Sequence, residues 1–214
     1  MFGSLVCFLI TGCLSVSAQG VNFNVYSAYV FDDKFDSYYN ASEYYKGKIK
    51  GGYQWGGGIE YQLRPEYGVE LLYLGQKTHA PTEYSGNGLQ KTYTDFDLGI
   101  SYVLLGGLRY FGPSEKKLQG FAGLMGGLVV ASLKNPDNGR SSSVTKFSWG
   151  VRAGGIVWAK ENVGIKLQVQ LLSAVQSVGG GFYFGTGGTG AGLSAYSTLY
   201  QLSLGGGMVF KIKT

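Results

Sequence analysis

The last stretch of the chain, residues 200–213, alternates between apolar residues and polar or small ones. Successive residues of a strand point to opposite faces, so one face of this segment is apolar and the other polar over fourteen residues. A strand of a globular sheet usually has about five or six residues, whereas a tilted strand needs about 9 to 11 to cross a bilayer. An open sheet would leave backbone groups unpaired in hydrocarbon. The pattern therefore predicts a closed barrel whose last strand pairs with its first.

The composition agrees with a single membrane barrel. Among 214 residues there are 37 Gly, 17 Tyr and 12 Phe, and only 14% are charged, which is unusual for a soluble domain. Glycine lets a narrow barrel close, and aromatic residues form belts at the membrane interfaces. The net charge of +5 comes from basic residues scattered singly along the chain. This scatter argues against a nucleic-acid partner, which would need a basic face.

The amino terminus predicts export. Residues 1–18 contain an apolar run and end in Val-Ser-Ala before Gln19, as a cleaved signal peptide does, although a basic start is missing. The barrel domain would then be residues 19–214. In the alternative, Ile-Thr-Gly before Cys13 resembles a lipobox, which would make Cys13 a lipidated terminus. Both cysteines, Cys7 and Cys13, lie in this segment, so no disulfide is expected in the mature chain.

Segments in which apolar and polar residues alternate recur along the rest of the chain. The connections between them are alternately long and polar, with twelve or more residues, and short and turn-like. The expected fold class is therefore all-β, an eight-stranded antiparallel up-and-down transmembrane β-barrel with its long loops at one rim. Ten strands are the alternative, if a long loop hides a hairpin. No helix is expected beyond the signal. The expected strands are residues 21–31, 51–63, 68–78, 92–111, 118–133, 146–160, 163–176 and 200–213.

The orientation of most segments follows from their apolar face, which is expected to meet lipid. In residues 92–111 this rule directs the even-numbered face, with Phe96 and Tyr110, outward and Arg109 inward. Residues 118–133 are apolar on both faces, so their orientation stays open.

These features resemble the small outer-membrane β-barrel proteins of Gram-negative bacteria, of the OmpA transmembrane domain, OmpX and opacity-protein type. The likeness rests on the signal, the eight strands, the asymmetry of turns and loops, and the ending Met-Val-Phe-Lys-Ile-Lys at residues 208–213. It implies a bacterial outer-membrane location, with the long loops outside the cell and contact with outer-membrane lipid and lipopolysaccharide. Many such proteins end on an aromatic residue, whereas four residues follow Phe210 here. The scaffold carries many unrelated functions.

Charged residues on the expected inward faces form the main candidate site. They should lie near the short-turn end of a narrow lumen, with Arg152 deeper, and opposite charges at one depth should pair. This predicts either a salt-bridged plug that holds the barrel together or a gate or selectivity filter. The members of this lumen charge cluster are Glu60, Glu70, Arg109, Arg152 and Lys166.

A second candidate is the first long connection, which is rich in tyrosine. Tyrosine supplies amphipathic contact area at low entropy cost, so a loop that binds a protein, a glycan or an envelope protein complex is one interpretation. The other is that the rings belong to the aromatic belt. The tyrosines concerned are Tyr38, Tyr39, Tyr44 and Tyr45.

The other motifs give little evidence for a functional site. Residues 185–190 match GxGxxG, but an alternating strand follows instead of a helix, so no nucleotide site is expected. His79 is the only histidine and no mature cysteine is expected, so neither metal nor cofactor is expected.

Three function classes remain. A non-enzymatic structural or docking protein is favoured, because the lumen looks filled. A narrow pore for small solutes or ions is the alternative. A lipid-modifying enzyme that uses His79 is the remote one, since no spacing identifies a serine or a carboxylate partner.

Overall fold

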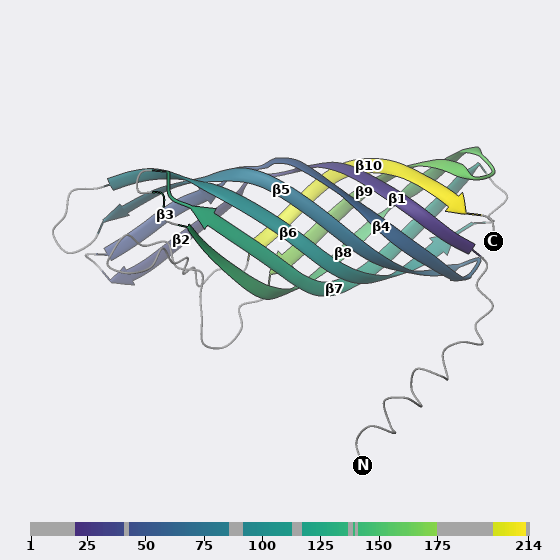
Figure 1. Cartoon of the computed structure of the whole chain (residues 1–214), viewed down its shortest axis with the longest axis horizontal. Helices are drawn as coiled ribbons and strands as arrows, with labels where there is room; N and C mark the ends of the chain where they lie inside the picture. The colour runs from purple at the N-terminus through teal and green to yellow at the C-terminus, as the bar shows by residue number, and fades with distance from the viewer. Residues whose placement is uncertain are drawn as a thin grey trace, which may run out of the picture.

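The computed structural model describes residues 20–40, 43–85, 92–112, 117–136, 139, 141–174 and 199–212. These residues form a long tube of antiparallel strands (Figure 1). The signal segment with Cys7 and Cys13, and the GxGxxG motif at 185–190, lie outside the described residues. No helix among the described residues is long and apolar enough to cross a membrane. The strands are β1 (Gly20–Val30), β2 (Asp33–Asn40), β3 (Glu43–Ile49), β4 (Gly52–Arg64), β5 (Tyr67–Ser85), β6 (Thr92–Phe111), β7 (Leu118–Lys134), β8 (Ser141–Lys160), β9 (Val163–Ala174) and β10 (Leu199–Ile212).

Eight of these strands form a closed ring, in the order β1, β4, β5, β6, β7, β8, β9, β10 and back to β1. The closing pair joins the first and last strands, with Val21 opposite Ile212 and Val30 opposite Ser203. Every backbone group in the ring can therefore pair with a neighbouring strand, as a bilayer requires. The predicted eight-stranded transmembrane barrel is confirmed.

The first long connection contains a hairpin, formed by β2 and β3. Its strand β3 pairs with the far end of β5, where Tyr44 lies opposite Ser85, so the hairpin stands beyond the ring. In the ring itself β1 pairs directly with β4, with Val30 opposite Gly52. The ten-stranded alternative is therefore wrong as a barrel, although a long loop does hide a hairpin.

Two of the expected long loops are shorter than predicted, because the strands beside them continue. β5 extends through His79 to Ser85, and β8 begins at Ser141. The four strands β5 to β8 have 17 to 20 residues each, well beyond the length needed to cross a bilayer. The wall therefore projects past the membrane at the end that carries β2 and β3. The short connections between ring strands lie at the other end, together with Gly20 and Ile212, the first and last described residues (Figure 1).

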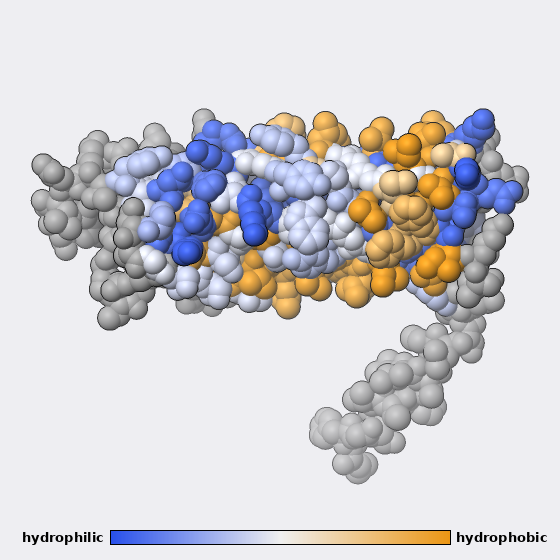
Figure 2. All heavy atoms as spheres, turned by 45° about the horizontal axis from the view of Figure 1, so that its top comes forward, coloured by the Kyte–Doolittle hydropathy of each residue, from blue (hydrophilic) through white to orange (hydrophobic). Residues whose placement is uncertain are grey.

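The outer wall changes chemistry along the tube. Towards the short turns its exposed side chains are apolar, as at Leu71, Leu105 and Leu124, and towards β2 and β3 they are polar, as at Lys77 and Asp97. Figure 2 shows the same division across one face. We call the two regions the turn half and the loop half; on β6 they are residues 102–111 and 92–101. The apolar band fits a bilayer around the turn half.

The orientation predicted for β6 is wrong. Its even-numbered side chains fill the lumen, with Phe96 and Tyr102 almost fully buried, and Arg109 lies on the outer surface. The assumption that the more apolar face of a strand meets lipid fails here. The loop half has water outside and an apolar interior, like a soluble barrel. The odd-numbered face turns from polar to apolar at Val103, where the strand enters the turn half.

The structure also settles β7, whose orientation the sequence left open. Odd-numbered side chains point into the lumen, including Phe121, Met125 and Val129. Even-numbered ones, such as Leu124 and Leu128, are exposed on the wall. On the remaining ring strands the described residues face as predicted, with Trp55 and Leu204 outward and Glu60 and Gln201 inward.

Candidate functional site

Four of the five members of the predicted cluster meet in the lumen of the turn half. Glu60, Glu70 and Lys166 have no exposed surface, and Arg152 has 3%. Arg109 is the exception, since it lies outside the barrel with its guanidinium over two aromatic rings. Two carboxylates and two cations therefore share a buried space, and their charges balance. We call these four residues, with the side chains that hold them, the charged layer.

The strand register brings the two carboxylates side by side. Glu60 and Glu70 are direct cross-strand neighbours on β4 and β5, and Asn22 of β1 lies opposite Glu60. Two like charges at such a position repel each other unless cations or donors compensate. Arg152 supplies the cation for Glu70, reaching across the lumen from β8 in a fully buried ion pair. Its guanidinium passes close to Gly106, where a Cβ would lie 3.9 Å from Nη2.

Tyr26 is the hub of the layer. Its hydroxyl donates to Glu70 Oε1 at 2.7 Å and accepts from Arg152 Nη1 and from Lys166 Nζ, each at 3.2 Å. The Lys166 ammonium also lies 4.9 Å from the centroid of the Phe121 ring. One phenol thus connects the anion to both cations, and a buried cation over an aromatic face is further stabilised.

Glu60 is held mainly by neutral donors. Tyr110 donates its hydroxyl to Oε1 at 2.5 Å, and Asn24 donates to Oε2 at 3.2 Å. The Asn24 amide also donates to Glu70 at 2.7 Å, which links the two carboxylates. Hydrogen bonds to a carboxylate are among the stronger ones in proteins, and a buried charge requires them.

Two glycines make the space that the carboxylates occupy. A Cβ on Gly58 would collide with the carboxyl oxygen of Glu70, and one on Gly68 would lie 2.6 Å from Glu60 Oε1. Both positions face the lumen, so any larger residue there would displace a carboxylate. Part of the glycine excess in the composition therefore serves the charged layer directly.

Apolar side chains lie on both sides of the charged layer. Towards the short turns it meets a cluster of five buried residues, with Trp158 packed against it. The Lys211 ammonium lies 3.8 Å from the centroid of the Trp158 ring. Towards the loops, a larger core fills the lumen, including Leu72, Phe96 and Tyr102. The members of the smaller cluster are Leu108, Tyr110, Phe121, Ile156 and Val209.

A belt of glutamines lies in the lumen as well. Gln201 accepts from the Tyr102 hydroxyl at 2.8 Å and donates to Gln76 at 3.1 Å, so these three residues bridge the lumen. Both polar atoms of Gln54, and one each of Gln168 and Gln170, have no hydrogen-bond partner among the described residues.

The sequence missed part of this site. Tyr110 was expected to face lipid, because the orientation of β6 was inverted. The signal for the other partners was present, since Asn22, Asn24 and Tyr26 share the polar face of the first strand. These three polar side chains lie on the inward face of the strand, at the same depth as Glu60 and Glu70. This pattern could have identified them as partners of the two carboxylates.

The other candidate residues have different surroundings. His79 lies on the outer wall of the loop half, where Nδ1 is 3.3 Å from Asp97 Oδ1 and both side chains are more than half exposed. The four tyrosines of the first connection lie in the hairpin, where Tyr38 pairs with Tyr44 and Tyr45 with Tyr84; their side chains are outside the described set. Within that described set, no group of three or more His, Cys, Asp or Glu could hold a metal ion.

Comparison with known proteins gives structural matches alone. No family model matches the sequence, and no curated protein matches it. Neisserial surface protein A has 15% identity and a TM-score of 0.56, over 92% of this chain and 99% of the other. The outer membrane protein OprG from Pseudomonas aeruginosa has 14% identity and a TM-score of 0.56, over 92% of this chain and 98% of the other. At this identity the likeness establishes the fold, so the chain has the architecture of a small eight-stranded outer-membrane β-barrel.

Proposed function

We propose that the protein is a non-conducting barrel of the bacterial outer membrane with a structural or docking role. The observation that supports it most is the position of the charged layer, which lies between two apolar layers of the lumen. Water and ions would have to pass Phe96 and Tyr102 on one side and Phe121 and Ile156 on the other. A buried network with paired charges links β1, β4, β5, β6, β8 and β9 and stabilises the closed ring.

Conductance in a planar bilayer tests this proposal. Refolded protein should give no steady current, and Glu70→Gln should stay silent too, because the apolar layers remain. Phe121→Ala combined with Trp158→Ala truncates two aromatic side chains of the layer nearest the short turns. This variant should still be silent while the larger core remains. Arg109→Gln is the matched control, since it removes a charge outside the lumen. A steady current through the unaltered protein would contradict the proposal.

The docking role is proposed for the β2–β3 hairpin. It stands beyond the ring and contains Tyr38, Tyr39, Tyr44 and Tyr45 in strands instead of a loop. Its strand β3 is anchored to β5 through four pairs, from Tyr44 opposite Ser85 to Gly47 opposite Thr82. Such an anchored, tyrosine-rich hairpin fits the binding of an envelope protein or a glycan.

Photo-cross-linking in intact cells tests the hairpin. A photoreactive residue in place of Tyr38 should give a cross-linked product of one defined mass. The same residue in place of Tyr73, an exposed aromatic on the wall of the turn half, is the control and should give none. Since Val30 lies opposite Gly52, residues 31–51 can be replaced by a short turn. That variant should fold and lose the partner.

The pore remains a second candidate because of one observation. The polar atoms of Gln54, Gln168 and Gln170 that have no partner among the described residues are buried, and such atoms usually bind ordered water. A hydrated belt of this kind would favour passage of small solutes if the apolar layers opened. Current that appears in wild-type protein and grows in Phe96→Ala would support the pore.

We propose no catalytic role. The His79–Asp97 pair is exposed, and no serine hydroxyl among the described residues hydrogen-bonds to this histidine. A serine and histidine dyad needs that contact. His79→Ala should therefore leave the lipid A and phospholipid composition of the membrane unchanged.

A further inference from the structure

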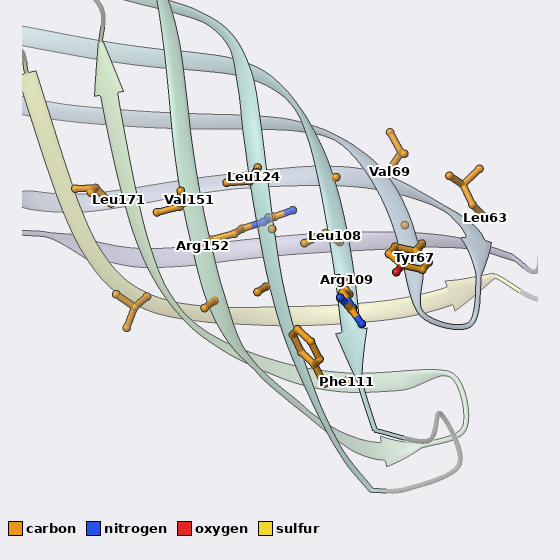
Figure 3. Close-up of a pocket in the computed structure, with 16 residues that line it drawn as sticks. Leu63, Tyr67, Val69, Leu108, Arg109, Phe111, Leu124, Val151, Arg152 and Leu171 are labelled. Carbon is orange, nitrogen blue, oxygen red and sulfur yellow. The ribbon is translucent and has the colours of Figure 1, made fainter.

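The outer wall of the turn half is hollowed by a furrow of about 850 Å³. It crosses the outer face from β5 to β9, and its lining is almost entirely apolar (Figure 3). The floor follows one row of cross-strand neighbours around the barrel. In order, this row is Tyr67, Arg109, Ala122, Ala153 and Val169.

Side-chain size explains the furrow. The floor carries two alanines, while the adjoining row carries larger residues such as Leu124, which is 70% exposed, and Val151 and Leu171. Neighbouring strands lie about 4.8 Å apart, so five strands give a floor roughly 19 Å long. One leaflet of a bilayer has an acyl layer about 15 Å thick. The furrow therefore has the length and the chemistry to hold one lipid acyl chain.

Arg109 lies next to Tyr67 near one end of this floor, two residues from the end of β6. Its guanidinium is 5.8 Å from the centroid of the Tyr67 ring and 5.5 Å from that of Phe111. Figure 3 shows these three side chains grouped close to the short-turn end. No carboxylate among the described residues forms an ion pair with it. The two aromatic rings thus position the guanidinium at the depth where lipid head groups begin. Its N–H groups can donate hydrogen bonds to phosphate oxygens.

We propose that this furrow is a binding site for an anionic glycerophospholipid of the leaflet beside the short turns. Arg109 donates to the lipid phosphate, Tyr67 and Phe111 flank the head group, and one acyl chain lies over Ala122 and Ala153. An arginine at this depth on a lipid-facing wall is tolerated near the interface and would be costly at the centre of the bilayer. The site opens on the outer wall, although Leu108 and Arg152, whose side chains are buried in the lumen, also border it. Lipid binding there does not depend on whether the lumen conducts.

Native mass spectrometry of the detergent-purified protein tests the site, with phosphatidylglycerol and phosphatidylcholine added in equal amounts. The unaltered protein should retain one phosphatidylglycerol with about a fivefold preference, the contribution expected of one basic residue beside an anionic lipid. Arg109→Gln should reduce that preference to nearly one. Lys160→Gln is the matched control, because it removes one exposed positive charge at the same end, outside the furrow, and should keep the preference.

A second variant separates the furrow from the charge. Ala153→Leu fills the floor with a side chain that suits a lipid-facing wall, and it should lower retention of both lipids. A mobility shift on heating in gel electrophoresis shows that each variant is folded. Equal retention of the two lipids by unaltered protein, or an unchanged preference in Arg109→Gln, would overturn the proposal. A specific dimer in place of bound lipid would overturn it as well and assign the furrow to a second copy of the chain.

Discussion

The two halves of this barrel are built in opposite ways. The turn half is apolar outside, as at Leu105 and Leu124, and holds two carboxylates and two cations inside. The loop half is polar outside, as at Lys77 and Asp97, and its lumen is mainly apolar, as at Phe96 and Leu98, with a few polar side chains such as Gln76. The backbone continues unchanged from one to the other. The medium around the wall therefore decides which chemistry each face carries, and a single strand can follow both rules.

A labelling experiment would break this comparison most directly. In a background with Cys7 and Cys13 replaced by serine, Asp97→Cys should react fully with a water-soluble maleimide in lipid nanodiscs. Leu105→Cys faces outward on the same strand, eight residues along, and should stay unlabelled because lipid covers it. Labelling both cysteines in the folded protein at equal rates would mean that the apolar band is not membrane-covered.

The charged layer should be the most sensitive part of the turn half. Glu70→Ala leaves Arg152 buried without its counter-ion and should lower the free energy of unfolding by about 3 to 5 kcal/mol. Urea unfolding in lipid vesicles measures this loss. Adding Arg152→Leu should recover much of it, because an apolar pair replaces the ion pair. A double variant as unstable as the single one would mean that the pair is not the cause.

In the loop half, the interior leucines should contribute to the free energy of unfolding as core leucines of a soluble protein do. Leu98→Ala removes a side chain that is 4% exposed and should cost about 2 to 5 kcal/mol. Leu105→Ala, at a position that is 59% exposed on the lipid-facing wall, is its matched control. It should cost less, because it loses apolar contact with lipid but leaves no cavity in a packed interior. Similar losses for both would erase the distinction between the inner and outer faces of β6.

The glycine beneath Glu70 gives a smaller, sharper test. Gly58→Ala should displace that carboxylate and lower the free energy of unfolding by about 1 to 3 kcal/mol. Gly107→Ala is the control, since a Cβ there meets nothing within 4 Å on the outer wall. A neutral Gly58→Ala would show that the charged layer can shift without loss.

The exposed His79–Asp97 pair on the loop half should contribute least to the free energy of unfolding. Asp97→Asn should change the free energy of unfolding by less than about 1 kcal/mol, because water screens an ion pair whose side chains are both more than half exposed. Urea unfolding of Asp97→Asn and of the unaltered protein in lipid vesicles measures this difference. A larger effect would indicate that this wall is covered, contrary to its polar surface.

The sequence alone determined the closed ring. The alternation of residues 200–213 and the order of turns and loops allow no open sheet in a bilayer, because every edge group needs a partner. The same alternation places Glu60, Glu70, Arg152 and Lys166 inside. Local pattern is sufficient there because those strands lie in lipid, where the apolar face must be the outer one.

Only the tertiary structure decided the rest. The alternating pattern of β6 is the same whether its more apolar face meets lipid or lines an apolar lumen. The side of the wall on which Arg109 lies therefore depends on what surrounds each half of the barrel. The hub formed by Tyr26 and the ion pair of Glu70 with Arg152 join strands far apart in the chain, and their contacts depend on the register around the ring. Alternation fixes the face on which a side chain lies; closure of the barrel fixes the partner it meets.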